Sequence, residues 1–539
     1  MGGVMETVER GKMMLDHIKD GFSNFKGKEF RPGQDEAIRL ILDSPKKVVV
    51  ICAPTGSGKS LIGMMVGAAH EKACYLCSSK QLQRQLMDDF PEARAMMGRS
   101  NFACNQDPQN RTADLCVHTP ATPCNLKGDC DYEVHKRAAL SHPLQILNYH
   151  YFLTEGNYVG NFAGYPMIIG DEADVLEGLL TSFVELRLSK ARLDSLSLVP
   201  PRYRTATAQS GLSSWREWAA EEGAIKIKAR MDKLRGRITT LKPDAAFTHQ
   251  DKLAVREYKS LEALLAKLAM FTSHMDESWI FQEQKNSRGR VDGWVFQPTW
   301  LTPELSRQYF FQHGDRFLFM SATFPPRTVL AQMVGLNPGD IDYLELPSTF
   351  PTSNRPVLLQ PVANMSHKSY EEELPKLVKE ICRILDKHPH ERGVIHTVSW
   401  KLNEAIRKLG DPRFIFHNSI DKDEVLERFS ESANGVFVSP SSTRGLDLPD
   451  DLCRFVIIAK APFQSLGDKL VASRVYGRGL GSFWYRAICA QDLVQASGRG
   501  VRHKDDYCVT YLLDKQIERL VVDNQNLFPK YWMEAVDYA

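Results

Sequence analysis

The chain has 539 residues, of which 43% are hydrophobic and 25% charged, and this globular composition excludes a wholly disordered protein. Its 68 Lys and Arg nearly balance its 66 Asp and Glu, so any nucleic-acid surface must be a local patch rather than a field over the whole molecule. The 11 cysteines are too few for a disulfide scaffold, and neither a signal peptide nor an apolar run of ~18 residues is present. We therefore expect a cytoplasmic, multidomain monomer with reduced thiols and no membrane partner.

Short, almost uninterrupted apolar runs recur in two groups along the chain. Such runs are typical of parallel strands that are buried on both faces. The first group comprises Val48–Ala53, Ala73–Cys77, Gln145–Leu147, Pro166–Gly170 and Arg316–Met320, and the second comprises Gly393–Val398, Phe414–His417, Gly435–Val438, Arg454–Ala459 and Tyr507–Leu513. This pattern predicts an α/β protein with two parallel-sheet lobes.

Two stretches interrupt this pattern. Residues 98–131 are polar and rich in Cys and Pro, whereas residues 179–294 contain helical apolar spacing with Lys and Arg between. The proline-rich segment Pro347–Pro361 is the expected linker between the lobes. The predicted division is 1–97, 132–178 and 295–345 for the first lobe, 98–131 for a cysteine module, 179–294 for a helical insertion and 346–539 for the second lobe.

A phosphate-binding pattern follows the first apolar run. Residues 53–60 read Ala-Pro-Thr-Gly-Ser-Gly-Lys-Ser, which is a P-loop except that Ala53 stands at the first glycine position. The turn lets backbone N–H groups surround phosphate oxygens, Lys59 is expected to reach the β- and γ-phosphates, and Ser60 to ligate Mg²⁺. The alternative is a glycine-rich turn that binds nothing. The candidate nucleotide contacts are Thr55, Gly56, Ser57, Gly58, Lys59 and Ser60.

Acidic residues end another predicted strand, at Asp171-Glu172-Ala173-Asp174. Ligands of open α/β sheets bind at the carboxyl ends of strands. Asp171 is therefore a candidate Mg²⁺ ligand, and Glu172 a candidate base for the attacking water. Gln34 upstream offers the donor and acceptor that reading an adenine edge requires. The alternatives are a solvated helix start for the acidic pair and a cap or solvent-facing side chain for Gln34.

Arginines near the carboxyl end complete the pattern. In Gln495-Ala-Ser-Gly-Arg499-Gly-Val-Arg502 the two arginines share one helix face, where they can stabilise transition-state charge on a γ-phosphate or simply face solvent. Further strand ends carry Thr443-Arg444-Gly-Leu-Asp447 and Ser321-Ala-Thr323.

In their order, these motifs resemble those of superfamily 2 helicases. The resemblance implies two RecA-like lobes with ATP between them. It also implies catalytic roles for Lys59, Asp171, Glu172, Gln495, Arg499 and Arg502, and ATP contacts that include Gln34 and Asp447. A DEAD-box RNA helicase is disfavoured, because that family has His where this chain has Gln495 and Pro-Thr-Arg-Glu-Leu where this chain has Ser78–Leu82.

The cysteine module contains Cys104, Cys116, Cys124 and Cys130 within 27 residues. Four thiolates can hold an iron–sulfur cluster or a zinc ion, with His118 and His135 as possible substitute ligands. The flanking segments Gly98–Cys104 and Leu147–Leu153 resemble those of XPD/DinG helicases. That resemblance implies a 4Fe–4S cluster on these cysteines and identifies the helical insertion with the arch of that family.

The same resemblance implies ATP-driven 5′→3′ translocation on single-stranded or forked DNA. Candidate DNA contacts are Ser79, Lys80, Gln81, Trp400, Thr443 and Arg444. Arg230, Lys233 and Arg237 either line a DNA path or form a solvated helix face, and Trp484 and Tyr485 either stack on bases or pack in the core. Repair, replication or CRISPR-type proteins are possible partners. The alternative functions are a nucleic-acid scaffold that does not unwind DNA and an RNA helicase with a structural zinc.

Overall fold

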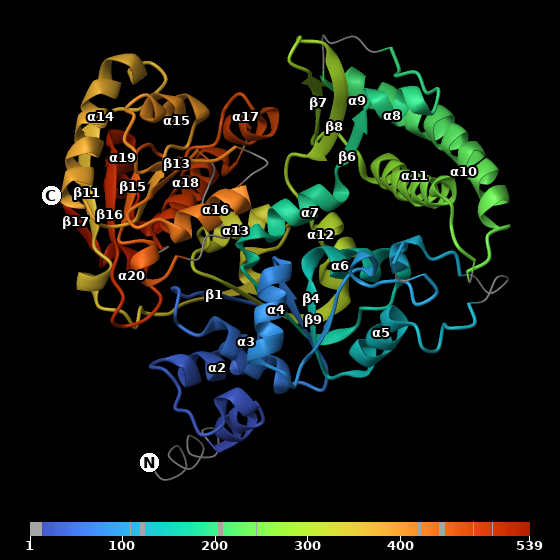
Figure 1. Ribbon diagram of the computed structural model, residues 1–539, viewed down its shortest axis with the longest axis horizontal. Helices are drawn as coiled ribbons and strands as arrows, with labels where there is room; N and C mark the ends of the chain where they lie inside the picture. Colours follow the sequence, from blue (N-terminus) through green and yellow to red (C-terminus); the bar gives the residue numbers. More distant parts are fainter. Residues whose placement is uncertain are drawn as a thin grey trace.

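The computed structural model describes residues 13–538 except 108, 119–123, 203–207, 244, 419–421, 441–447, 478 and 499. Three bodies are visible: a first lobe at the bottom of Figure 1, a second lobe at the left, and an arch-shaped insertion at the upper right. The predicted residues Thr443, Arg444, Asp447 and Arg499 lie outside the described part. Among the described residues, no helix combines the length and apolar character needed to cross a bilayer.

The first lobe holds a seven-stranded parallel sheet in the order β10-β1-β9-β5-β2-β4-β3. Its strands are β1 (Val48–Cys52), β2 (Ala73–Cys77), β3 (Arg94–Met96), β4 (Leu144–Asn148), β5 (Tyr165–Asp171), β9 (Gly314–Ser321) and β10 (Ile341–Glu345). Its helices are α2 (Gln34–Asp43), α3 (Lys59–Ala68), α4 (Lys80–Asp89), α5 (Asp131–Ser141), α6 (Tyr149–Thr154), α7 (Leu176–Val184), α12 (Pro303–Tyr309) and α13 (Arg327–Met333). The central strands are buried on both faces, as uninterrupted apolar runs require.

The second lobe holds another seven-stranded parallel sheet, in the order β13-β14-β12-β15-β16-β11-β17. Its strands are β11 (Val357–Ala363), β12 (Gly393–His396), β13 (Phe414–Phe416), β14 (Val436–Ser439), β15 (Phe455–Ile458), β16 (Val509–Asp514) and β17 (Val536–Tyr538). Its helices are α14 (Tyr370–Lys387), α15 (Trp400–Arg407), α16 (Lys422–Glu431), α17 (Lys469–Tyr476), α18 (Gly481–Ser497), α19 (Lys515–Asp523) and α20 (Lys530–Met533). Two parallel-sheet lobes are therefore confirmed.

The arch is more than the helical insertion that the sequence predicts. It contains helices α8 (Lys190–Ser195), α9 (Ala208–Trp218), α10 (Ala224–Ile238) and α11 (His249–His274), and also an antiparallel sheet of β6 (Leu186–Ser189), β8 (Val291–Pro298) and β7 (Trp279–Lys285). The alternating burial of β6 hides it from a search for uninterrupted apolar runs. Similarly, β11 begins inside the segment expected to be a linker.

Candidate functional site

The P-loop connects β1 to α3 at the carboxyl edge of the first sheet. Gly56 and Gly58 both adopt φ of 80°, a left-handed conformation that glycine tolerates and other residues rarely adopt. Helix α3 begins at Lys59 without a side-chain cap, so its first turn can direct backbone N–H groups at an anion. The Lys59 ammonium donates to the Ala53 carbonyl at 3.1 Å. The local structure is thus that of a phosphate cradle.

Both lobes contribute to the walls of a cavity of about 710 Å³ around this loop. The first lobe supplies Gln34, the P-loop and Glu172, and the second lobe supplies Gln495 and Arg502. The structure therefore brings together most of the described residues that the sequence predicts for the nucleotide, although those of the two lobes are more than 300 residues apart in the chain.

Two predicted Mg²⁺ ligands meet at one tyrosine. The Tyr75 hydroxyl donates to Asp171 Oδ2 at 2.7 Å and also hydrogen-bonds with Ser60. The pKa of Asp171 is raised to about 6, chiefly because burial penalises the charged carboxylate and secondly because Glu172 carries a like charge, while the Lys59 ammonium opposes both. A hydroxyl and a carboxylate are the oxygen donors that Mg²⁺ prefers, so these residues fit that ion.

Asp174 connects the two lobes directly. It accepts from Ser321 Oγ of the first lobe at 2.8 Å and from Gln491 Nε2 of the second lobe at 3.3 Å. Gln495 Nε2 in turn lies 3.4 Å from Ser321 Oγ. The last acidic residue of the DEAD motif, the Ser-Ala-Thr motif and helix α18 therefore form one hydrogen-bonded network across the cleft.

Gln34 and Arg502 have internal partners in this structure. Gln34 Nε2 donates to the Ser57 carbonyl at 2.9 Å, and Gln34 Oε1 accepts from Arg31 N at 2.8 Å. Arg502 donates through Nη1 to the Gly498 carbonyl at 3.3 Å and through its backbone N to Asp506. Gln34 thus contacts the P-loop, and Arg502 lines the cavity.

Sequence reasoning missed two residues that line the cavity, Phe350 and Arg355. A Cβ added to Gly56 would lie 2.3 Å from the Phe350 ring, so this aromatic ring covers the P-loop. Arg355 donates to the carbonyls of Phe350 and Tyr531. Both residues follow the first lobe in the segment that crosses to the second, and that position was the available signal.

Comparisons with known proteins place these motifs in a family. The DEAD/DEAH box helicase family matches residues 31–207, and the helicase C-terminal domain family matches residues 379–535. The ATP-dependent DNA helicase CHL1 of Saccharomyces cerevisiae is 28% identical over 170 residues, which are 27% of this chain and 20% of that protein. CHL1 of Kluyveromyces lactis is 28% identical over 141 residues, 22% of this chain and 17% of that protein. The matched segments thus span about a fifth of the relatives' length.

Solved structures agree with this fold over nearly the whole chain. An XPD helicase aligns with a TM-score of 0.60 and 16% identity, covering 95% of this chain and 100% of its own. The structure of S. tokodaii Xpd4 aligns with a TM-score of 0.55 and 15% identity, covering 94% and 100%. The chain carries the DEAD/DEAH box helicase domain and the helicase C-terminal domain, and it shares its fold with these XPD structures. Its two lobes have the RecA-like fold.

The four cysteines of the module carry free thiols and are half-buried. Two of them accept hydrogen bonds, from the Gln106 amide to Cys124 Sγ at 3.5 Å and from His118 N to Cys116 Sγ at 3.4 Å. Cys130 is the N-cap residue of α5. These surroundings fit thiolate ligands.

Among the described residues, no three of these four sulfurs lie within 4.8 Å of one another. A zinc ion and a 4Fe–4S cluster therefore both stay predictions for this module. Of the possible substitute ligands, His118 accepts from Cys124 N through Nδ1, and His135 Nδ1 contacts the Asp131 carbonyl.

The arch is attached both to the cysteine module and to the first lobe. Lys259 of α11 donates to the carbonyls of Asp114 and Cys116, and Arg111 donates to the Pro243 carbonyl at 2.6 Å. On the first-lobe side, the Lys267 ammonium caps the end of α7 by donating to the Ser182 and Phe183 carbonyls. Burial lowers the pKa of Lys267 to about 8.

The predicted DNA contacts are dispersed over the molecule. Ser79 and Gln81 line the nucleotide cavity, and the Ser79 hydroxyl caps α4. Lys80 donates to Asn101 at 2.8 Å, at the edge of the cysteine module. Trp400 is 52% exposed at the start of α15. Their roles in DNA binding stay predictions.

Two candidate base-stacking or DNA-path features have other partners. Trp484 is buried in the core, and Tyr485 stacks on Phe463 with ring centroids 4.9 Å apart. On the arch, Arg230 pairs with Glu257 and Arg237 with Asp251, each at 2.8 Å. Core packing and a paired helix face are therefore the arrangements observed.

Proposed function

We propose that the protein is an ATP-dependent DNA helicase that moves 5′→3′ along single-stranded DNA. The observation that carries this proposal is the cavity whose phosphate-binding wall belongs to one lobe and whose Gln495 and Arg502 wall belongs to the other. Hydrolysis at such a cleft changes the contacts between lobes, and two lobes that alternate their grip can move along a strand. The names of the matched relatives support DNA as the substrate.

Each residue of the site has a distinct task in this proposal. The P-loop N–H groups and Lys59 bind the phosphates, and Ser60 and Asp171 hold Mg²⁺, which would neutralise phosphate charge when bound. Glu172 orients the attacking water and accepts its proton. Arg502 supplies positive charge from the second lobe, while Asp174, Ser321 and Gln495 relay the state of the nucleotide between the lobes.

Stimulation of hydrolysis by nucleic acid tests this function. We expect ATP hydrolysis to be faster with single-stranded DNA than without it, and faster than with RNA of the same sequence. Equal hydrolysis with and without DNA would contradict the motor. Stronger stimulation by RNA would favour an RNA helicase, and tight DNA binding without any strand separation would favour a scaffold.

The direction of movement has its own test. A duplex with a single-stranded 5′ tail should be unwound, and the same duplex with a 3′ tail should not be, because a 5′→3′ motor loads on the 5′ tail. A strand-displacement assay with the two fluorescent substrates measures both rates. Unwinding of the 3′-tailed substrate alone would reverse the proposed direction.

The cysteine module should bind a 4Fe–4S cluster. Anaerobically purified protein is expected to be brown and to contain about four irons per chain. Cys124→Ser should lose most of this iron because it removes one thiolate. Cys382→Ser, at an exposed position on α14, is the matched control and should keep it. A colourless protein with a single zinc would contradict the cluster.

A further inference from the structure

Helix α17 belongs to the second lobe in sequence but contacts the base of the arch and the first lobe. It contacts β7, as its position beside that strand in Figure 1 suggests. Lys469 donates to the Phe281 carbonyl at 3.3 Å, and the hydroxyls of Ser473 and Thr299 lie 3.4 Å apart. This contact is separate from the nucleotide cavity, which α17 does not line.

Arg474 is the centre of this contact and is only 3% exposed. Its guanidinium pairs with Glu177 of α7 at 2.5 Å and donates to the Thr299 carbonyl at 2.7 Å. It also lies 4.5 Å from the ring centroid of Trp300 and 4.9 Å from that of Trp484. A charge buried this deeply depends on such partners, and all of them except Trp484 lie outside the second lobe.

Trp484 connects this buried arginine to the helix that reaches the nucleotide site. On α18, Trp484, Gln491 and Gln495 recur at seven- and four-residue steps, so they lie on one helix face. The rings of Trp484 and Trp300 pack edge to face with centroids 5.5 Å apart. The Gln491 amide donates to Asp174, and the Gln495 amide donates to Ser321. This face of α18 therefore contacts the first lobe over about 16 Å, from Trp484 beside Arg474 to Gln495 at the cavity.

Helices α17 and α18 approach each other closely at Gly481. A Cβ added to Gly481 would lie 1.7 Å from the Arg474 carbonyl oxygen, so only glycine permits this approach of the two helices. Since α18 begins at Gly481, the position of Arg474 determines where α18 starts.

We propose that Arg474 is a positioning residue for ATP hydrolysis. Its ion pair with Glu177 and its packing between Trp300 and Trp484 fix the start of α18 against the first lobe. The end of the same helix thereby carries Gln495 and the following turn with Arg502 to the phosphates. Arg474 does not itself reach the cavity, and the inference rests on the proposed hydrolysis between the lobes.

Full-length Arg474→Gln and Glu177→Gln variants test this role. Breaking a buried ion pair is strongly destabilising, so each variant should loosen the packing of α18 on the first lobe. We therefore expect each variant to lower kcat for ATP at least about tenfold. The Kd for a fluorescent ATP analogue should change by less than about twofold, because the P-loop is intact. Arg383→Gln, which removes an exposed pair with Glu380 inside α14, is the control and should leave both values unchanged.

The conservative Glu177→Gln variant keeps an acceptor for Arg474 and guards against misfolding of the arginine variant. Unchanged kcat in folded Glu177→Gln would overturn the proposal, and so would loss of ATP binding together with a large fall in melting temperature in both variants. A wild-type protein that hydrolyses no ATP would instead contradict the proposed function.

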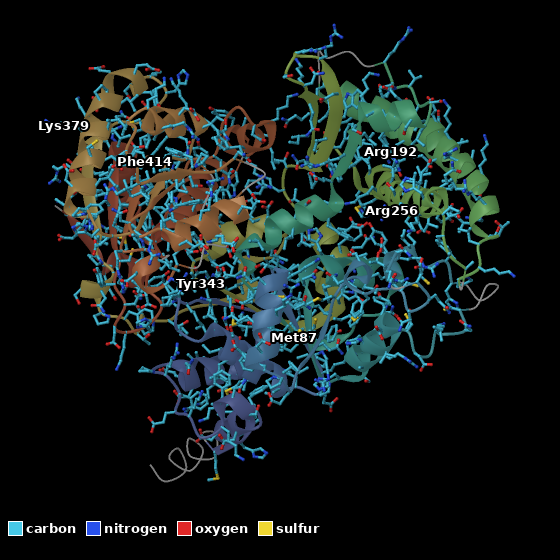
Figure 2. The ribbon with its side chains drawn as sticks, in the orientation of Figure 1. Met87, Arg192, Arg256, Tyr343, Lys379 and Phe414 are labelled. Carbon is cyan, nitrogen blue, oxygen red and sulfur yellow. The ribbon has the colours of Figure 1, made fainter. Side chains whose placement is uncertain are left out.

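Closure of the two lobes is a second measurement. It uses energy transfer between dyes at Met87 and Lys379, which lie on different lobes in Figure 2. A non-hydrolysable ATP analogue should close wild type and not Arg474→Gln, and equal closure of the two would overturn the proposal.

Discussion

Replacing Lys59 with alanine should abolish ATP hydrolysis, lowering kcat by at least about a thousandfold. The lysine is the cation that the P-loop directs at the phosphates, from the first residue of α3. In the described part of the chain the Lys59 ammonium donates to the Ala53 carbonyl, and its charge opposes the raised pKa of the buried Asp171. Its removal should raise the pKa of Asp171 further, so that this group holds a proton rather than an unpaired buried charge. Steady-state hydrolysis with saturating single-stranded DNA measures the loss.

Lys26→Ala is the matched control for this change. Lys26 is an exposed lysine of the same lobe that does not line the cavity. It should retain wild-type hydrolysis, and both variants should melt at the wild-type temperature. A folded Lys59→Ala protein with more than about a tenth of wild-type kcat would mean that the P-loop is not the phosphate site.

Replacing Glu172 with glutamine should lower kcat by about 10²–10⁴ while ATP still binds, because the amide cannot accept the proton of the attacking water. The substitution keeps the side-chain shape. The backbone of residue 172, at φ of 47° and donating to Asp171 Oδ1 at 2.9 Å, should therefore be retained. Single-turnover hydrolysis measures the chemical step, and titration with a fluorescent analogue measures binding.

Glu71→Gln, which changes an exposed carboxylate of the first lobe, controls for the loss of one negative charge. It should hydrolyse ATP at the wild-type rate. If Glu172→Gln retained full activity, the base would have to be another group, and the assignment of the DEAD motif to catalysis would be wrong.

Sequence reasoning predicted the parts of the fold that local patterns determine. The buried strands β1, β2, β5 and β12 are almost continuously apolar in sequence, and the glycines of the P-loop indicate a turn. The edge strands β3 and β10 were missed because their partly exposed residues do not form apolar runs. The sheet of the arch was missed because β7 and β8 pair with each other and with β6 through mixed sequences.

The candidate site was predictable as a set of motifs but not as a network. Nothing near Asp174 in the sequence indicates that Gln491 of the second lobe donates to it. The same holds for Glu177, which lies one helical turn beyond Asp174 and whose partner Arg474 is almost 300 residues away. Partners of this kind depend on how the two lobes pack against each other, and contacts between lobes leave no repeating pattern in the sequence.

Helix α7 connects the nucleotide site to the arch. It starts immediately after the acidic motif, and at its far end the Lys267 ammonium of α11 binds its last carbonyls. A helix of this length is a stiff rod of about 13 Å. If the end of α7 near the nucleotide tilts, the other end, where the arch is attached, is therefore displaced. If the arch were exchanged for that of a relative, an amine at the position of Lys267 would be needed to keep this attachment.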